Sequence, residues 1–122
     1  DVVESLITSH STNYPLNTFL CKDLVNYNNI EFASLIIIRD VIFHLKNEEI
    51  LSIFENIRNK FDFLLITSCK NNINTDNFSK CHFSEKNIHN EPFNKSHYFE
   101  KCIDEPVFKR TVYIYTHDNF YK

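Results

Sequence analysis

The stretch LIIIRDVIFHL, residues 35–45, decides the fold of this chain. Its first four residues are apolar and extend a segment, rich in β-branched side chains, that begins at residue 33. Such a run, apolar on both faces, is typical of a central parallel strand covered by helices on both sides. Arg39 and Asp40 follow directly. Because ligands of open α/β sheets bind beyond the carboxyl ends of parallel strands, we expect this pair to face a cleft.

The residues after this strand predict a βαβ unit. Asn47 is the expected N-cap of a helix, with Glu48 and Glu49 in the first turn, where the helix dipole favours carboxylates. Residues 61–68, FDFLLITS, are predicted to form a second buried strand. A strand, helix and strand with short connections form a right-handed unit in nearly all proteins. The apolar stripe of the helix is Ile50, Leu51, Ile53, Phe54 and Ile57.

The N-terminal part is predicted from helical spacing and turn residues. Val3, Leu6 and Ile7 recur at helical intervals, so we expect a helix over residues 2–12 with Asp1 at the cap. Residues 18–22, TFLCK, are predicted to form a short strand that ends before Asp23.

The C-terminal part is predicted to contain a long loop and a hairpin. Residues 70–97 are mostly polar, and a loop of this length is usually functional or disordered. Residues 97–103 and 110–117 alternate in polarity, which predicts an antiparallel hairpin at the sheet edge. No linker divides the sequence, so we expect a single domain over residues 1–122.

Composition limits the classes of function. The net charge of −3 gives no electrostatic indication of nucleic-acid binding, and the apolar runs are too short to cross a bilayer. No signal-peptide pattern opens the chain, so four widely spaced cysteines are expected to be free thiols in a reducing, intracellular compartment. Structural zinc needs closely paired ligands, and only Cys81-His82 suggests one, so we predict no metal site.

Two residue types are missing. There is no Met, from which we expect the chain to be a piece of a longer protein or a product of processing. There is also no Gly, so tight turns must be made by Asn, Asp, Ser or Pro.

The run RDVIFHL (39–45), the helix after it and LLIT (64–67) resemble class I S-adenosylmethionine-dependent methyltransferases. The likeness continues at Asn74-Thr75-Asp76, at Asn87-Ile88 and at residues 91–94, so it covers nearly the whole chain. It implies an α/β fold with a mostly parallel, partial Rossmann-like sheet and a C-terminal antiparallel hairpin. The strand order of the family is three, two, one, four, five, seven, six. On this likeness, the strand ending at Ile38 is strand four.

The resemblance also implies residues that bind S-adenosylmethionine. Asp1 falls where the family places the acid that binds the ribose hydroxyls, and a carboxylate there accepts strong, charge-assisted hydrogen bonds. Asp23 falls near the adenine amino group, and Leu24 would offer its backbone N–H to the ring. Arg39 and Asp40 fall beside the methionine portion of the cofactor.

On the substrate side, the resemblance implies that His44, Asn74 and Asn87 face the methyl acceptor. No catalytic residue is implied, because a sulfonium methyl is already electrophilic and catalysis is mostly positioning. His44, on an otherwise apolar segment, also fits a hydrogen-bonded structural histidine.

The chain departs from the family at its first strand and glycine-rich turn, which are absent. Either a preceding segment or another chain supplies them, or strands three and four pair directly. The implied function is methyl transfer from S-adenosylmethionine to an unknown acceptor by a longer chain or assembly. The alternative is a non-catalytic methyltransferase remnant that serves as an interaction module in a larger complex.

Overall fold

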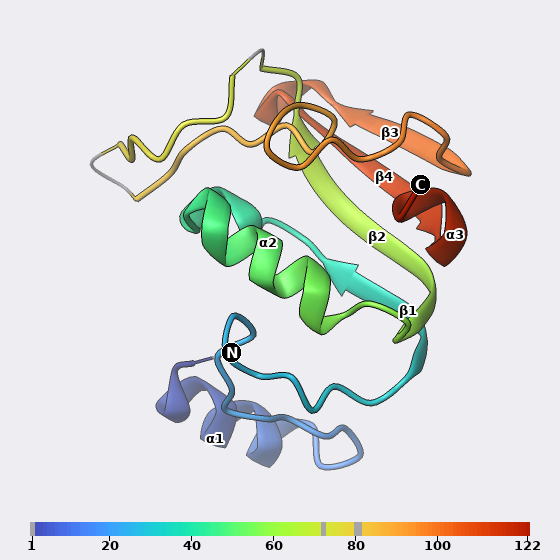
Figure 1. Cartoon of the computed structure of the whole chain (residues 1–122). Coiled ribbons are helices and arrows are strands. Elements are labelled where there is room, and N and C mark those ends of the chain that lie inside the picture. Colours follow the sequence, from blue (N-terminus) through green and yellow to red (C-terminus); the bar gives the residue numbers. More distant parts are fainter. Residues whose placement is uncertain (1, 72, 80–81) are drawn as a thin grey trace.

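The computed structural model describes residues 2–71, 73–79 and 82–122. It has the expected α/β architecture, with a four-stranded sheet in the order β1-β2-β4-β3 (Figure 1). The expectation of a mostly parallel sheet is wrong, because only one of the three strand pairs is parallel. β1 and β2 run parallel, whereas β4 runs antiparallel to both β2 and β3. The elements are α1 (Glu4–Asn13), β1 (Ala33–Ile38), η1 (Ile42–His44), α2 (Asn47–Asn56), β2 (Phe61–Cys69), β3 (Lys101–Glu105), η2 (Pro106–Phe108), β4 (Arg110–Thr116) and α3 (His117–Phe120).

The predicted βαβ unit is confirmed as β1-α2-β2. The helix begins at Asn47, and its N-cap is Lys46, one residue before the predicted cap. The backbone N–H of Lys46 donates to the Glu49 carboxylate at 2.7 Å, which satisfies one of the free amide groups at this end. Leu51 was wrongly assigned to the apolar stripe, since it is 37% exposed. The buried stripe is Ile50, Ile53, Phe54 and Ile57.

β1 is an edge strand in the described sheet, which corrects the expectation of a central strand covered on both faces. Ile38 is 1% exposed and packs in the core, whereas Leu35 and Ile37 point to the opposite face and are 47% and 60% exposed. Phe63 and Ile103 continue this outer face on β2 and β3. The prediction failed because an apolar run has the same pattern whether or not its second face is covered.

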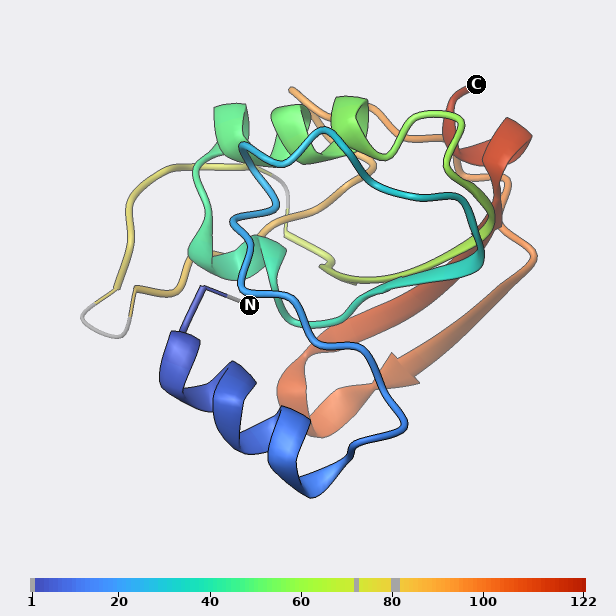
Figure 2. The same ribbon diagram turned by 90° about the horizontal axis from the view of Figure 1, so that it is seen from below.

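The predicted N-terminal helix is confirmed as α1, although it buries none of its residues. The two views agree that α1 lies apart from α2 (Figure 1, Figure 2). The expectation that Asp1 caps this helix lies outside the described residues.

The predicted strand at residues 18–22 is wrong, because these residues form no regular element. A strand needs a neighbour for its backbone hydrogen bonds, and this segment has none in the described sheet. The chain instead reaches the core at Leu24 and Val25, whose carbonyl oxygens accept from the Asn56 side-chain amide at 3.1 and 2.9 Å. Direct pairing of this segment with β1, one of the alternatives above, does not occur.

The predicted C-terminal hairpin is confirmed as β3 and β4, but β4 is an inner strand between β2 and β3. Tyr113 and Tyr115 share the core face of β4, as their spacing predicts. The turn is a short 3-10 helix that ends at Phe108 and is capped by Lys109, a residue in the left-handed conformation with φ 53°.

Turns without glycine use asparagine and aspartate at three of five described positions with positive φ. Asp40, Asn59 and Asn94 follow the expectation, whereas His82 and Lys109 do not. Both exceptions lie in exposed segments. Across the described residues, no helix is both long enough and apolar enough to cross a membrane.

Candidate functional site

Four charged side chains meet beyond the carboxyl end of β1, and we call them the strand-end cluster: Arg39 and Asp40 follow β1, Glu105 ends β3 and Arg110 opens β4. Arg39 donates to Glu105 at 2.6 Å, and an Arg110 nitrogen lies 2.7 Å from an Asp40 oxygen. The backbone N–H of Asp40 donates to the Thr67 hydroxyl at 2.7 Å. The sequence therefore places Arg39 and Asp40 correctly at the end of β1, and the fold adds two partners from the hairpin.

Local backbone and ring contacts position the cluster. Asp40 has φ 59°, a left-handed conformation that a short polar residue tolerates better than most. The Arg110 guanidinium lies 5.0 Å from the centre of the Phe43 ring and 5.6 Å from that of Phe83, which favours a cation over their faces. The two positive and two negative charges balance, so each charged group has an ion-pair partner within the chain. Glu105 Oε2 and Arg110 Nε are nevertheless buried without a hydrogen-bond partner among the described residues.

Asp23 and Leu24 are not part of this cluster. Asp23 accepts from the backbone N–H of Val25 and from the side chain of Asn26, an arrangement that closes a turn. Because Asn56 ends α2 and holds this turn, Asp23 lies near the amino ends of the strands, away from Arg39. The expectation for Asp1 lies outside the described residues.

The long loop is irregular, as predicted, but side-chain amides organise it. Asn74 donates to the carbonyl oxygens of Asn87 and Glu91, both at 2.8 Å, and accepts from the Asn87 N–H at 2.7 Å. Asn87 in turn donates to the Asn71 carbonyl at 2.8 Å. Asn74 and Asn87 therefore stabilise the loop, and their polar groups are mostly occupied.

His44, the third substrate-side residue, lies exposed at the end of the 3-10 turn η1. Its Nδ1 lies 2.8 Å from the carbonyl oxygen of His82, so Nδ1 carries the proton and donates. This contact ties η1 to the long loop and fits the structural alternative for His44.

Lys86 anchors the loop to α2, although its side chain is fully buried. Its ammonium group donates to Asn47 Oδ1, the Thr75 carbonyl and Asp76 Oδ1 at 2.8, 2.6 and 2.9 Å. Burial alone raises the pKa of Asp76, but hydrogen bonds from Lys86 and from the Asn47 N–H outweigh it, so that pKa is lowered. Three acceptors are what a buried ammonium needs to offset its lost hydration.

A pocket of about 680 Å³ opens between this loop and the start of α2. One residue that the resemblance assigns to the substrate side, Asn74, lines it. Its volume falls within the range of small-molecule sites. The lining residues are Asn47, Ile73, Asn74, His89, Asn90, Glu91, Pro92 and Asn94.

His89, at the edge of this pocket, stacks on His97 with ring centres 4.2 Å apart. Its Nδ1 lies 3.2 Å from the Lys95 carbonyl, and its Nε2 is buried without a hydrogen-bond partner among the described residues. Burial lowers the pKa of His89, and the neighbouring His97 adds to this effect. His89 is therefore neutral near pH 7.

Acid is expected to destabilise the fold through His89. Because the folded-state pKa is lowered, the unfolded chain binds this proton more readily, so stability falls as pH drops below about 6.5. Urea unfolding over a range of pH should show that decline in the native chain and a smaller one in His89→Gln. Identical pH profiles for the two proteins would contradict this role.

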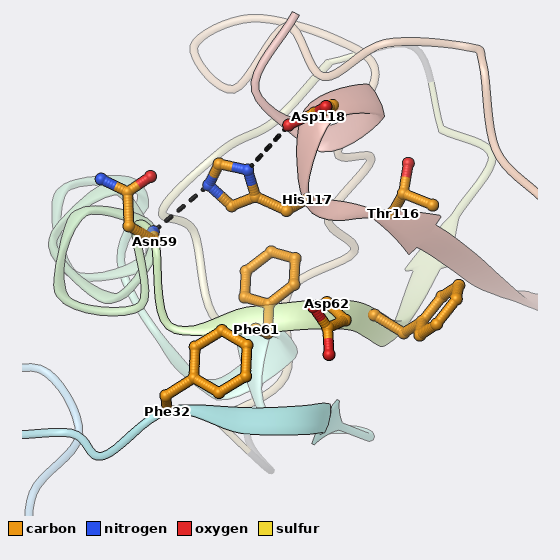
Figure 3. A pocket seen from close by; sticks show the side chains of 8 residues that line it. Phe32, Asn59, Phe61, Asp62, Thr116, His117 and Asp118 are labelled. Atoms are coloured by element: carbon orange, nitrogen blue, oxygen red, sulfur yellow. Dashed lines mark hydrogen bonds and ion pairs between the residues drawn. The ribbon is translucent and has the colours of Figure 1, made fainter.

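A second hollow of about 500 Å³, the amino-end pocket, lies where β1 and β2 begin (Figure 3). The His117 ring lines this pocket and bonds at both nitrogens. The Asn59 N–H donates to His117 Nε2 at 3.2 Å, and His117 Nδ1 lies 3.1 Å from an Asp118 oxygen. The lining residues are Phe32, Asn59, Phe61, Asp62, Phe63, Thr116, His117 and Asp118.

The described cysteines Cys21, Cys69 and Cys102 are free thiols. Burial raises the pKa of Cys69, which keeps that thiol protonated. In the described ranges, no three His, Cys, Asp or Glu side chains are grouped to hold a metal ion. The Cys81-His82 pair falls partly outside those ranges.

Sequence reasoning did not find Glu105, Arg110 or Lys86. Glu105 and Arg110 flank the hairpin turn, and no local pattern distinguishes them from solvated surface charges. The one feature that could have identified them is their position at the hairpin. Arg110 opens β4, and the register of β4 with β2 places Arg110 opposite Cys69, beside the end of β1. Lys86 gave no signal, because nothing in the sequence marks a lysine as buried.

Comparisons of this chain with protein-family models, with curated proteins and with solved structures found no match.

Proposed function

We propose that this chain forms the later half of a class I methyltransferase-like sheet and takes part in methyl transfer from S-adenosylmethionine to an unknown acceptor within a larger assembly. The main observation in favour of this proposal is the order of the strands in the sheet. The order β1-β2-β4-β3, with β4 antiparallel, corresponds to strands four, five, seven and six of the order that the resemblance implies. The insertion of the last strand between its two predecessors is not required by any local pattern, which makes the correspondence informative.

The free edge of β1 supports the need for a further part. The Ala33 N–H donates to the carbonyl oxygen of Lys60, the residue just before β2, so alternate residues from Ala33 point their backbone groups at β2. The groups of Ser34, Ile36 and Ile38 then point to the open edge. An apolar edge of this kind is a template for another strand. In the implied order strand one lies here, supplied by another segment of the same protein or by another chain.

The described residues do not by themselves fit S-adenosylmethionine. The family cradle needs a glycine turn because the backbone must approach the ligand closely, and the chain has no glycine. Arg39 and Asp40 are engaged in the strand-end cluster, and Asp23 lies elsewhere. Cofactor binding is therefore proposed only for the assembly, with Arg39 and Asp40 beside the site.

A non-catalytic interaction module is the second candidate. It is favoured by the charge balance of the strand-end cluster, which leaves no ionised group there unpaired for a ligand. In that case the β1 edge and outer face serve assembly alone.

The experiment compares the isolated chain with the same chain purified together with its native partners. Hydrogen exchange at Ser34, Ile36 and Ile38 should be fast in the isolated chain and slowed in the assembly, because pairing protects edge amides. Calorimetry should detect S-adenosylmethionine binding in the assembly alone. Asp23→Ala should leave that affinity unchanged, because Asp23 closes a turn away from Arg39.

The results separate the two candidates. Protection of β1 without cofactor binding would favour the interaction module over the methyltransferase. Unprotected β1 amides in the assembly would overturn the proposed docking edge. Weaker cofactor affinity in Asp23→Ala would instead place Asp23 at the cofactor site. The exposed Glu48→Ala serves as a control variant.

A further inference from the structure

Two of the aromatic side chains that line the amino-end pocket are exposed to solvent. Phe32 is 61% exposed and Phe63 is 44% exposed, whereas Phe61, which also lines the pocket, is buried. In Figure 3 the Phe32 ring, the Phe61 ring and the His117 imidazole line the same hollow, from the entry to β1, from β2 and from α3. Exposed aromatic rings gathered around a hollow mark a binding surface more often than single exposed apolar residues do.

The polar groups of this pocket are acidic. Asp62 has no ion-pair partner among the described residues, and Asp118 contacts only the His117 ring among them. Because His117 Nε2 accepts from the Asn59 N–H, the imidazole is neutral in this arrangement and its proton is on Nδ1. Among the described residues, no Lys or Arg lines the pocket, so its two carboxylates are not balanced from within.

We propose that the amino-end pocket binds an alkylated ammonium group, such as the head of choline or a methylated lysine side chain. Such a group presents a diffuse positive charge with an apolar surface. Ring faces attract it through their quadrupoles, and the nearby carboxylates add Coulombic attraction. An anion would be repelled, and a neutral ligand would gain nothing from the two carboxylates. The pocket lies at the opposite end of β1 and β2 from the strand-end cluster, so the site is independent of the proposed function.

The test is a titration of the isotope-labelled chain, followed by nuclear magnetic resonance. Choline should shift the amide signals of Asn59, Asp62 and His117, and its uncharged carbon isostere dimethylbutanol should bind about fivefold more weakly or not at all. A peptide with trimethyllysine forms a second arm: tighter binding than choline identifies a protein partner, and equal binding identifies a small molecule as the source.

Two variants test whether choline binds at these residues. Phe32→Ala and Asp62→Asn should each weaken choline binding by about two- to fivefold without unfolding the chain, since both side chains are exposed. Phe108→Ala removes an equally exposed ring elsewhere and should leave choline affinity unchanged. Absence of shifts at the pocket, equal binding of the uncharged isostere, or equal loss in Phe108→Ala would overturn the proposal.

Discussion

Replacing Ile38 with alanine is expected to lower the free energy of unfolding by about 3 kcal/mol. The side chain is 1% exposed and lies in the core between the sheet and α2. The substitution loses the transfer free energy of the deleted methyl and methylene groups and leaves a cavity that the rigid sheet cannot close. Urea unfolding at neutral pH gives the difference directly, provided that the slope of the transition is unchanged.

Ile37→Ala is the matched control, since it changes the same residue type on the same strand. Ile37 is 60% exposed on the outer face, so its loss should change stability by about 0.5 kcal/mol or less. Equal losses at the two positions would show that both faces of β1 are buried, against the described fold. In the assembly proposed above, Ile37→Ala should become costly, because a neighbouring part would then cover the outer face.

The contrast between these two isoleucines shows what the sequence can predict. The βαβ unit follows from local information: an apolar β-branched run, a helical stripe with acids in its first turn, and a second apolar run. These patterns fix β1, α2 and β2 to within a residue or two. They cannot tell whether the second face of β1 is covered, because coverage depends on elements far away in sequence.

The wrong strand at residues 18–22 has a related cause. Thr18-Phe19-Leu20 has good strand propensity, but propensity measures fit to a pleated surface and supplies no hydrogen-bond partner. β1 is a described edge strand, but residues 18–22 do not pair with it, and the chain packs against the core at Leu24 and Val25 instead. In the proposed assembly, a partner for this segment would come from the further part.

The candidate site was predicted in part for the same reason. The position of Arg39 and Asp40 follows from the end of a parallel strand, which is a local feature. Their partners come from the hairpin, with Glu105 lying 66 residues after Arg39 in sequence. That meeting depends on β4 inserting between β2 and β3, an arrangement that alternating polarity alone does not specify. The strand-end cluster could therefore be located from the sequence, but its charge balance could not.

Replacing Asp76 with alanine is the second large effect, with an expected loss of about 2 to 3 kcal/mol in the free energy of unfolding. The change leaves the buried Lys86 ammonium with only two neutral acceptors and removes the acceptor of the Asn47 N–H at the start of α2. Removing one partner of a buried pair costs more than the pair itself contributes. The side chain of Asp76 is 42% exposed, which keeps the expected loss below the roughly 3 to 5 kcal/mol typical of breaking a fully buried pair.

Lys70→Ala tests whether burial, and not the ion pair alone, sets this cost, because it breaks an exposed pair and leaves Asp104 to accept from Thr111. Lys70 and Asp104 pair at 2.8 Å, nearly the 2.9 Å of Lys86 and Asp76, but both side chains are more than half exposed. No measurable loss is expected, because water and salt screen such a pair. Because the pKa of Asp76 is lowered in the folded chain, its contribution is present above pH about 4 and disappears as the pH falls through the folded pKa. Equal losses for the two variants at neutral pH would mean that Lys86 is not buried as described, and the loop would then need another anchor at α2.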